Sequence, residues 1–322
     1  MKRRLLWLLP VLFVFIFLDA CAPLRRPAPG GNIPPIPDQI SRGNRQEPVL
    51  KVYMHDTQQV KEMPMEEYIA GVVAAEMDPK WPLEALAAQA ILARTFTLQK
   101  IASQGGVPNR NAHASTDIEE FQAYDASRVN DQVRQAVQRT RGEVAVAGGQ
   151  FIRAWFHANS GGRTATAVEG LAFDKEPTPY VVSIEDSISV QAAPEDQQVW
   201  KATFSKDEVK RAVQEVGSRV GDFSRIEIVE RGPSGRATKL GIGSAVVSAT
   251  AFRLAIGSTE MRSTLLEDIT VKGNSVTFTG KGYGHGVGMS QWGAKGRADR
   301  GEKAETIVQA YYKQISIEKI WD

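Results

Sequence analysis

Hydrophobic and polar positions change their spacing several times along the chain. Residues 49–54 alternate between apolar and polar side chains, which predicts a strand. A helix is predicted over residues 64–77, since a proline opens this segment and Asp-Pro ends it. A second helix is predicted over residues 82–103, where apolar residues recur three and four positions apart. Its apolar stripe is wide, which is typical of a helix that is buried on most sides.

The remaining elements follow in mixed order. Helices are predicted at 130–140, 206–216 and 302–312, and strands at 143–147, 151–157, 225–231, 237–242 and 276–279. Because helices and strands do not alternate in regular β-α-β units, the pattern favours an α+β fold over a doubly wound sheet. We expect mixed helices and antiparallel strands in one large domain over residues 49–322, with 225–315 as a candidate subdomain.

The N-terminus has the features of an export signal. Three basic residues precede an apolar run from Leu5 to Leu18 that only Pro10 interrupts. Fourteen helical residues rise about 21 Å, less than the hydrocarbon core of about 30 Å, so this run is too short to span a bilayer. The sole cysteine, Cys21, follows in the sequence LDAC, which resembles a bacterial lipoprotein box. We therefore predict a lipoprotein-type signal peptide over residues 1–20 and lipid attachment at Cys21.

The alternative is a free cysteine just beyond an uncleaved anchor. On either interpretation the rest of the chain lies outside the membrane, at the outer face of the cell membrane, and is tethered to it. Residues 22–48 contain seven prolines and three glycines. Such a composition predicts a linker, which could reach roughly 80 Å if extended at about 3.1 Å per residue.

Composition and charge remove several classes of function. The 322 residues include 39 Lys+Arg and 37 Asp+Glu, for a formal net charge of +2. Cleavage before Cys21 would remove three basic residues and one acidic residue, leaving a formally neutral protein, so charge does not favour a nucleic-acid partner. One cysteine excludes an internal disulfide and a Cys-rich zinc site. The four histidines form no H-x-x-x-H or H-E-x-x-H pair, and we expect no metal and no cofactor.

Glu76 is the first candidate for chemistry. It ends the mostly apolar segment GVVAAE, where partial burial would raise the pKa of its carboxyl group and suit it to general acid work. An ordinary surface glutamate near a helix end is the alternative. Arg94 and Gln89 lie on the next predicted helix, in AQAILARTF. An arginine on a buried helix must be paired or face a cleft, so Arg94 either forms a structural ion pair or contacts a ligand.

His157 and Ser160 are candidate substrate-binding residues, because FHANSGG places them where a strand enters a polar, Gly-rich loop. A lone histidine is more often structural than catalytic. The chain has no G-x-S-x-G elbow and no evident acidic partner, which counts against a serine hydrolase.

The segment GKGYGHGVGMSQWG, residues 280–293, is the most informative motif. Five glycines alternate with other residues, so an extended strand here would have one face without side chains. A bare face admits a close backbone or a flat ligand such as a sugar ring. The alternatives are a bulged turn and a close crossing of two strands. If the segment binds a sugar, we expect its substrate-binding residues to be Lys281, Tyr283, His285 and Gln291.

Three blocks together resemble the stage II sporulation protein D family, which includes the amidase enhancers. They are YIAGVVAAEMDPKWPLEALAAQAILARTF, FHANSGGRTA and GKGYGHGVGMSQWGAKG, and they follow the family's order over about residues 48–315. The resemblance implies a protein outside the membrane that acts on peptidoglycan. It implies a lytic transglycosylase for peptide-stripped glycan strands, with Glu76 as catalytic acid and base and Arg94 also functionally important. Some members bind zinc near the block that matches FHANSGG, but this chain has no cysteine there.

The sequence favours two possible functions. A lytic transglycosylase needs one acid, which protonates the glycosidic oxygen and then takes a proton from the substrate's own C6 hydroxyl, whereas ordinary glycosidases need two carboxylates. Arg94 could orient Glu76 or stabilise developing charge. The other function is a non-catalytic peptidoglycan-binding module that stimulates a cell-wall amidase. A hydrolase that uses His157 and Ser160 is a third and weaker interpretation.

Overall fold

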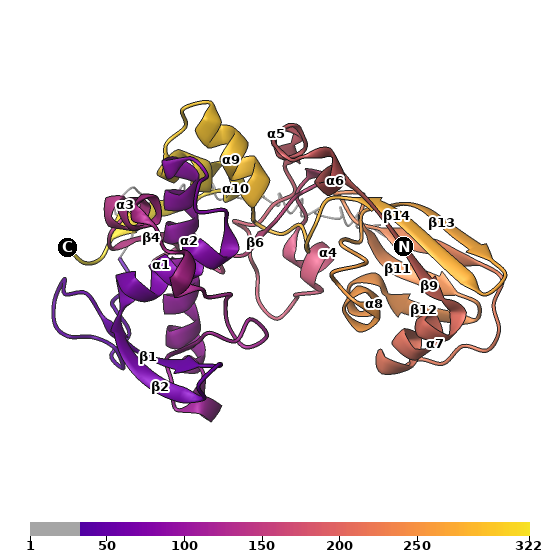
Figure 1. The fold of residues 1–322 in the computed structure, drawn as a ribbon, viewed down its shortest axis with the longest axis horizontal. Coiled ribbons are helices and arrows are strands. Elements are labelled where there is room, and N and C mark those ends of the chain that lie inside the picture. Colours follow the sequence, from indigo (N-terminus) through magenta and orange to yellow (C-terminus); the bar gives the residue numbers. More distant parts are fainter. Residues whose placement is uncertain (1–32) are drawn as a thin grey trace, which may run out of the picture. The chain divides into compact units, whose positions relative to one another are not determined.

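The computed structural model describes residues 33–322, so the predicted signal peptide and Cys21 lie outside the described residues. Helices and mostly antiparallel strands are mixed along the chain (Figure 1), which confirms the α+β prediction. The helices are α1 Met65–Glu76, α2 Leu83–Gln104, α3 Asp131–Arg139, α4 Ala167–Leu171, α5 Ser187–Ala192, α6 Glu195–Gln198, α7 Lys206–Glu215, α8 Ala249–Ile256, α9 Gln291–Asp299 and α10 Ala304–Tyr311, with 3-10 turns η1 Pro108–Arg110 and η2 Ala126–Arg128.

The strands form small sheets. They are β1 Val49–Met54, β2 Gln59–Pro64, β3 Ala114–Ser115, β4 Glu143–Ala147, β5 Gln150–Phe151, β6 Phe156–His157, β7 Gly162–Arg163, β8 Glu185–Asp186, β9 Val199–Ser205, β10 Ile226–Arg231, β11 Ala237–Ile242, β12 Ala245–Ser248, β13 Leu266–Lys272, β14 Ser275–Lys281, β15 Met289–Ser290 and β16 Ser316–Lys319. The three-stranded sheets have the orders β2-β1-β3, β10-β11-β12, β13-β14-β9 and β16-β4-β5, and the two-stranded sheets pair β15 with β6 and β7 with β8.

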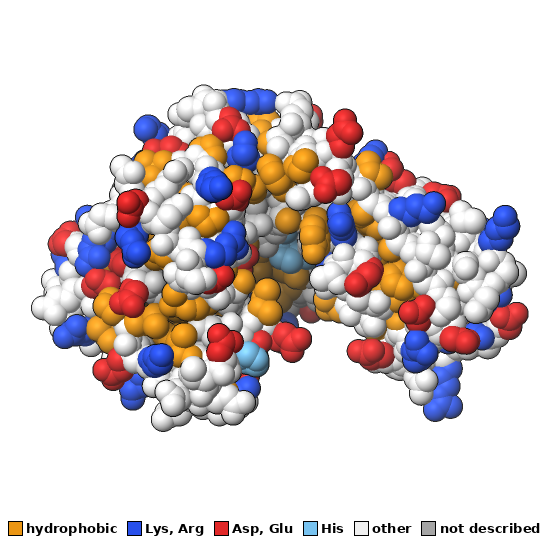
Figure 2. Space-filling model, viewed as in Figure 1, with side chains coloured by type: hydrophobic (Ala, Val, Ile, Leu, Met, Phe, Trp, Pro, Cys, Tyr) orange, Lys and Arg blue, Asp and Glu red, His pale blue; other side chains and the backbone are white. Residues whose placement is uncertain are grey.

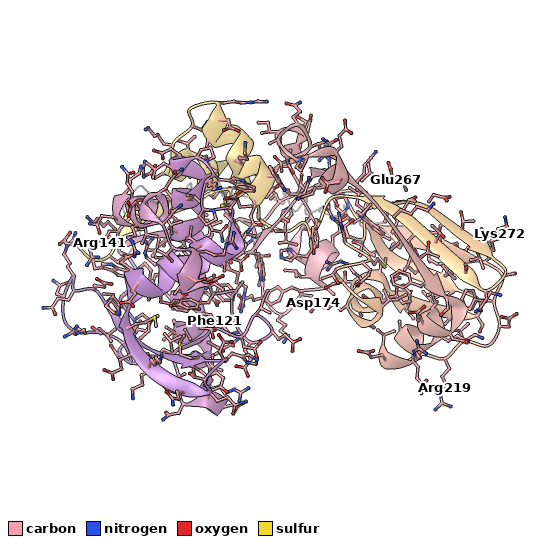
Figure 3. All side chains as sticks on the ribbon, in the orientation of Figure 1. Phe121, Arg141, Asp174, Arg219, Glu267 and Lys272 are labelled. Atoms are coloured by element: carbon pink, nitrogen blue, oxygen red, sulfur yellow. The ribbon has the colours of Figure 1, made fainter. Side chains whose placement is uncertain are left out.

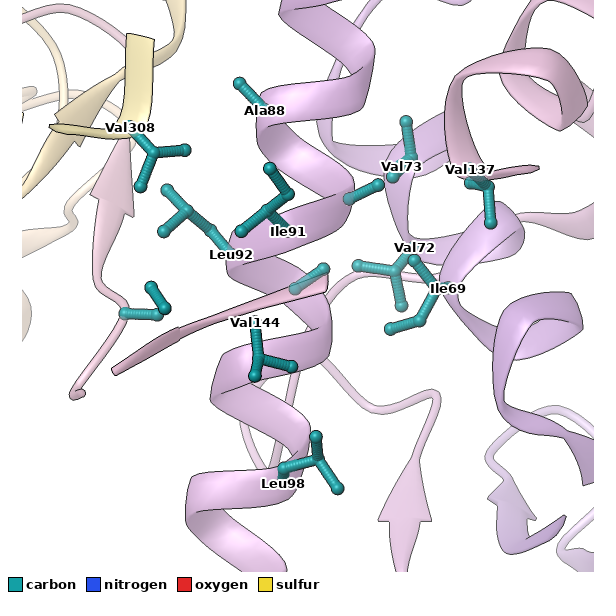
Figure 4. Packing of buried hydrophobic residues seen from close by; sticks show 14 of the residues in the cluster. Ile69, Val72, Val73, Ala88, Ile91, Leu92, Leu98, Val137, Val144 and Val308 are labelled. Atoms are coloured by element: carbon teal, nitrogen blue, oxygen red, sulfur yellow. The ribbon is translucent and has the colours of Figure 1, made fainter. Parts of the chain in front are cut away.

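The first hydrophobic core is built around α2. Buried side chains cover most of the circumference of this helix, as the wide apolar stripe predicts. Ile91 and Leu92 of α2 lie among Val73 of α1, Val144 of β4 and Val308 of α10 (Figure 4). The helix ends at Gly105, which adopts the left-handed conformation with φ 75° that favours glycine. The core therefore holds both ends of α1 and α2 in place, including Glu76 at the end of α1.

A second hydrophobic core involves residues 200–278. The sheets β10-β11-β12 and β13-β14-β9 and the helices α7 and α8 contribute to it. Alternation along β9 and β14 buries every second side chain, so each strand presents one apolar face to this core. Ser205 caps α7 through a capping box with Glu208, which fixes where strand β9 turns into helix.

The glycine-rich segment is not the extended strand that its alternation predicts. Strand β14 ends at Lys281, and the glycines at 282, 284, 286 and 288 all have positive φ values between 73° and 102°. The chain loops here and closely crosses its own residues 155–161. A Cβ atom on Gly282 would lie 2.7 Å from the carbonyl oxygen of Asn159, and one on Gly288 would lie 2.0 Å from that of Trp155. The glycines therefore make room for the protein's own backbone. The exposed face without side chains that an extended strand would have is not present in this segment.

Residues 33–48, which the composition predicts to be linker, pack against the first core. The side chain of Ile40 is 3% exposed and belongs to that core. The carboxylate of Glu47 accepts hydrogen bonds from Arg141 at 2.5 Å and from the backbone N–H of Glu66 at 2.9 Å. The folded body therefore begins before Val49. Within residues 33–322, no helix combines the length and the apolar character that crossing a bilayer requires.

Candidate functional site

Glu76 occupies the last position of α1, with a partly buried side chain. Its Oε1 accepts a hydrogen bond from the backbone N–H of Ala123 at 3.2 Å, and its Oε2 accepts a long one of 3.4 Å from the amide of Gln291. Burial raises the pKa of Glu76 from 4.5 to about 7, although both hydrogen bonds pull it down. A carboxyl group with this pKa can both give and take a proton near neutral pH.

The loop that carries Ala123 is packed directly onto α1. Gly71 makes this possible, because a Cβ atom there would lie 2.2 Å from the ring of Tyr124. The backbone N–H of Asp125 donates to the carbonyl oxygen of Gly71 at 3.0 Å, and Gln122 donates to Thr97 of α2 at 3.1 Å. Phe121, in the same loop, lies beside the first-core helices (Figure 3). The Glu76 carboxyl is therefore held by a braced loop.

Gln291 reaches the site from the other end of the chain. It is the first residue of α9, directly after the cap residue Ser290, whose hydroxyl accepts from the N–H of Gly293 at 3.2 Å. Its side chain is 7% exposed. Of the predicted substrate-binding residues, Gln291 is the one that the structure brings to Glu76.

Two tryptophans that follow Glu76 and Gln291 in the sequence were missed by the sequence reasoning. Trp81 follows α1 in the turn before α2, and Trp292 follows Gln291. Their ring centroids are 4.5 Å apart at an interplanar angle of 53°. The indole N–H of Trp292 donates to the side chain of Gln197 at 2.7 Å. Trp81 lies in the motif AAEMDPKW and Trp292 in SQWG. Their closeness in sequence to the candidate acid and to Gln291 could have identified them as site residues.

Arg94 does not contact Glu76. Its guanidinium is fully buried and forms a bidentate ion pair with Glu66, with N–O distances of 3.1 and 2.6 Å. The same group also donates to the carbonyl oxygens of Ala90 at 3.3 Å and Glu143 at 2.8 Å. The expectation that Arg94 orients Glu76 is corrected, because its donors are taken by these acceptors. Of the two interpretations of Arg94, the structural ion pair describes this geometry.

Gln89 is fully buried on α2. Neither its amide nitrogen nor its carbonyl oxygen has a hydrogen-bond partner among residues 33–322. It is not one of the hydrogen-bond donors to Glu76.

His157 and Ser160 are buried in the loop crossing and do not face a ligand. Ser160 is 0% exposed, and its hydroxyl accepts from the N–H of Gly162 at 3.1 Å while its carbonyl oxygen accepts from Arg236 at 2.6 Å. His157 Nδ1 lies 3.1 Å from the carbonyl oxygen of Val287, and burial keeps the pKa of the ring well below its usual value. His157 contacts the glycine-rich segment through Val287, whereas Ser160 is bonded to Gly162 and Arg236, and neither side chain is exposed; their prediction as substrate-binding residues is therefore corrected.

The other predicted substrate-binding residues, Lys281, Tyr283 and His285, contact groups other than Glu76. Lys281 forms an ion pair with Glu267 of β13, which Figure 3 labels. The ring of Tyr283 lies 5.4 Å from the guanidinium of Arg262. His285 Nδ1 accepts from the N–H of Val287 at 3.0 Å. Burial first, and then two nearby arginines, lower the pKa of His285 to about 3, so its ring is neutral at physiological pH.

Asp186 is a second acid with a perturbed pKa, which the sequence analysis did not single out. Burial raises its pKa to about 6, and the hydroxyl of Tyr311 donates to it at 2.8 Å. The side chain is 2% exposed and lies against Gly293 of α9. Because it is enclosed, Asp186 braces α9 and α10 and is not open to a substrate. Within the described residues 33–322, no three His, Cys, Asp or Glu side chains gather in a way that could hold a metal ion.

The molecular surface is hollowed on one face, with hydrophobic side chains along the wall of the hollow (Figure 2). A separate cavity of about 500 Å³ is lined by β9 residues from Val199 to Phe204 and by Asp196, Thr259, Glu260 and Arg262. It lies on the second core and does not include Glu76.

Comparison with known proteins gives two family matches. Residues 53–146 match the family described as stage II sporulation protein, and this stretch contains Glu76 and Arg94. Residues 181–288 match a domain of unknown function, which coincides with most of the second core.

Curated relatives match most of the chain. An uncharacterised protein of Brachyspira hyodysenteriae is 33% identical over 262 residues, which is 80% of this chain and 67% of the relative. Stage II sporulation protein D of Bacillus subtilis is 30% identical over 287 residues, 83% of this chain and 78% of the relative. The amidase enhancer of Bacillus subtilis is 27% identical over 298 residues, and the match spans 76% of this chain but 39% of that relative.

Proposed function

Because this chain belongs to the stage II sporulation protein D family and has a role related to the cell wall, we propose that it is a lytic transglycosylase. Its substrate is the glycan strand of peptidoglycan from which the stem peptides have been removed. Glu76 is its single acid and base. The reaction serves cell-wall remodelling, as in sporulation.

The main support for this proposal is the protonation of the Glu76 carboxyl group. Its pKa of about 7 leaves a large protonated fraction at neutral pH, which a general acid requires. The Glu76 carboxyl group accepts hydrogen bonds from two neutral donors, the Ala123 N–H and the Gln291 amide. Within the described part of the chain, no second acidic side chain contributes to the raised pKa of Glu76. This favours a reaction with one carboxyl group over a hydrolysis that requires two.

The steps balance with one proton and no added water. Glu76 gives its proton to the glycosidic oxygen, and the bond between this oxygen and the muramoyl anomeric carbon breaks. The C6 hydroxyl oxygen of the same muramoyl ring bonds to that carbon, and the resulting Glu76 carboxylate takes the hydroxyl proton. The products are a 1,6-anhydro-muramoyl end and a free hydroxyl on the leaving sugar. The Ala123 N–H and Gln291 amide stabilise the carboxylate between the two proton transfers.

Mass analysis of the products tests the proposal. Peptide-free glycan strands incubated with the purified chain should yield fragments with anhydro ends, and the Glu76→Gln variant should yield none above background. Glu67→Gln is the matched control, because Glu67 is an exposed residue of the same helix. Undiminished anhydro ends from Glu76→Gln would contradict the role of Glu76, and ends that carry added water would indicate a hydrolase.

A second candidate follows from the similarity to a protein named amidase enhancer. In this case the chain binds peptidoglycan and stimulates a cell-wall amidase without cutting the glycan itself. Digests with the purified chain alone would then contain no new anhydro ends, while a cell-wall amidase would release stem peptides faster in its presence.

The proposed location is the outer face of the cell membrane, with a lipid anchor at Cys21. Support comes from the sequence, through the signal-like apolar run and the LDAC motif. Metabolic labelling with a radioactive fatty acid should mark the full-length chain and leave the Cys21→Ser variant unlabelled. Equal labelling of both would contradict the anchor.

A further inference from the structure

Two tryptophans from distant parts of the chain, Trp81 after α1 and Trp292 in α9, meet ring to ring. Trp81 lies five residues after Glu76, and Trp292 directly follows Gln291, whose amide reaches the Glu76 carboxyl at 3.4 Å. Their rings are tilted by 53° with centroids 4.5 Å apart, so neither ring covers the other completely. Both side chains are partly exposed.

This exposure separates the pair from the fully buried aromatic side chains of the first core, although Trp155 and Tyr180 share it. Tyr68, Tyr311 and Trp321 are at most 1% exposed. The two partly exposed indoles leave flat apolar surface that a ligand can cover. Aromatic side chains beside a few convergent polar groups are the usual lining of a small-molecule site.

The backbone of Trp81 and the indole of Trp292 are both held by hydrogen bonds. The turn that carries Trp81 is braced by Asn130, which donates to the carbonyl oxygen of Pro79 at 3.0 Å, and by Gln132, which donates to that of Trp81. The N–H of the Trp292 indole is bonded to Gln197 at 2.7 Å, and its backbone N–H donates to Ala158 at 3.0 Å. A ligand would therefore meet rings that are already ordered, which lowers the entropic cost of binding.

A pyranose ring matches this surface. One face of such a ring presents C–H groups and is apolar, while its edge carries hydroxyl and acetamido groups. The apolar face can stack on an indole, and the polar edge can then approach Gln291 and Glu76.

From this arrangement we propose that Trp81 and Trp292 form a sugar-stacking subsite for one N-acetylated hexosamine ring of the strand, next to the bond that Glu76 cleaves. The inference rests on the proposed function, which it deepens by assigning substrate-binding residues. The two tryptophans bind the ring and take no part in proton transfer.

Binding of soluble, peptide-free glycan hexasaccharides to the full-length Glu76→Gln variant tests the subsite. Calorimetric titration keeps binding separate from turnover in this variant. Adding Trp81→Leu or Trp292→Leu should weaken the affinity by about tenfold or more, because leucine lacks the flat ring surface that the sugar covers. Trp81→Phe and Trp292→Phe should stay within about threefold of the parent, since a ring remains.

Trp155→Leu is the matched control. Trp155 is also partly exposed and also pairs with an aromatic ring, Phe173, at a centroid distance of 5.1 Å. It should leave the affinity unchanged. Undiminished affinity in both the Trp81→Leu and the Trp292→Leu variants would overturn the subsite, as would the absence of any binding by the parent.

A second measurement avoids variants that fail to fold. Fluorine NMR of the Glu76→Gln protein labelled with 5-fluorotryptophan should show the Trp81 and Trp292 signals shifting on addition of hexasaccharide, while the Trp155 signal stays. The phenylalanine variants assign the signals. No shift at a saturating concentration would overturn the subsite.

Failure of the subsite and failure of the transglycosylase proposal are distinguishable. Loss of affinity in the leucine variants without any anhydro ends from the unmodified chain would leave a glycan-binding site on a protein that does not cut. Anhydro ends together with unchanged affinity would retain the chemistry and remove the subsite.

Discussion

Two of the three glutamates of helix α1, Glu66 and Glu76, lie ten residues apart in opposite surroundings. Glu66, in its first turn, is 8% exposed and accepts hydrogen bonds from the Arg94 guanidinium, from the Gly142 N–H at 3.0 Å and from the Trp321 indole at 2.8 Å. Glu76, at its end, accepts hydrogen bonds from two neutral donors among residues 33–322, at 3.2 and 3.4 Å. One carboxylate is thus fully paired, and the other keeps bonding capacity for a ligand.

The difference separates a structural carboxylate from the proposed acid and base. The Glu66 cluster ties the start of α1 to α2 and to the C-terminal Trp321, so removing one partner would leave a buried charge. No positive side chain of the described residues pairs with Glu76, and burial raises its pKa to about 7. Sequence reasoning grouped Arg94 with Glu76, whereas the structure groups it with Glu66.

The largest expected effect is on activity at Glu76. Glu76→Gln should lower the rate of anhydro-end formation by about 10²–10⁴-fold, the usual contribution of general acid–base catalysis. Its thermal unfolding midpoint at neutral pH should not fall, since an uncharged amide replaces a carboxyl that burial disfavours in its charged form. Calorimetry and product assays on the same preparation check both parts, and a variant that unfolds early would mean that Glu76 is structural.

The opposite pattern is expected at Arg94. Arg94→Ala should lower the free energy of unfolding by about 3–5 kcal/mol, because Glu66 is left buried without its partner. Activity per folded molecule should remain within a few-fold, measured at a temperature where the variant is folded. Denaturant unfolding gives the stability. A stable Arg94→Ala protein without activity would instead restore a catalytic role for Arg94.

The pH dependence of stability gives a smaller effect. Because the folded state raises the pKa of Glu76 from 4.5 to about 7, the folded protein holds this proton more tightly than the unfolded chain does. Stability from this group is therefore present below pH 4.5 and declines as the pH rises to about 7. Unfolding midpoints across this range should fall more steeply for the unmodified chain than for Glu76→Gln. Parallel curves would contradict the raised pKa.

The smallest effect is expected from Gln291. Its hydrogen bond lowers the pKa of Glu76, so Gln291→Met, which keeps the length of the side chain and removes the donor, should raise that pKa. The acid form is needed first, so activity falls as the pH rises past the pKa, and this fall should move to higher pH in the variant. A profile that moves to lower pH, or not at all, would show that Gln291 does not act on Glu76.

Local patterns predicted the elements better than the site. The helix over 82–103 and its end at Gly105 follow from apolar spacing and from the conformational freedom of glycine, which are properties of neighbouring residues. Of the interpretations left open for residues 280–293, the extended strand is wrong, and a tight turn with a close backbone crossing describes the structure. Alternating glycines fit a bare strand face and a tight loop equally well, and only the approach of the 155–161 backbone selects the loop.

The chain itself determined the α+β class, the apolar character of α2, and the candidate acid at the end of an apolar helix. These depend on spacing and composition within a few turns. Only the tertiary structure decided which partners each charge received. Gln291 lies 215 residues from Glu76 and Trp321 lies 255 residues from Glu66, so both contacts arise from packing of distant segments. Burial and pairing set the pKa and the role of a carboxyl group, and neither is a property of its sequence neighbours.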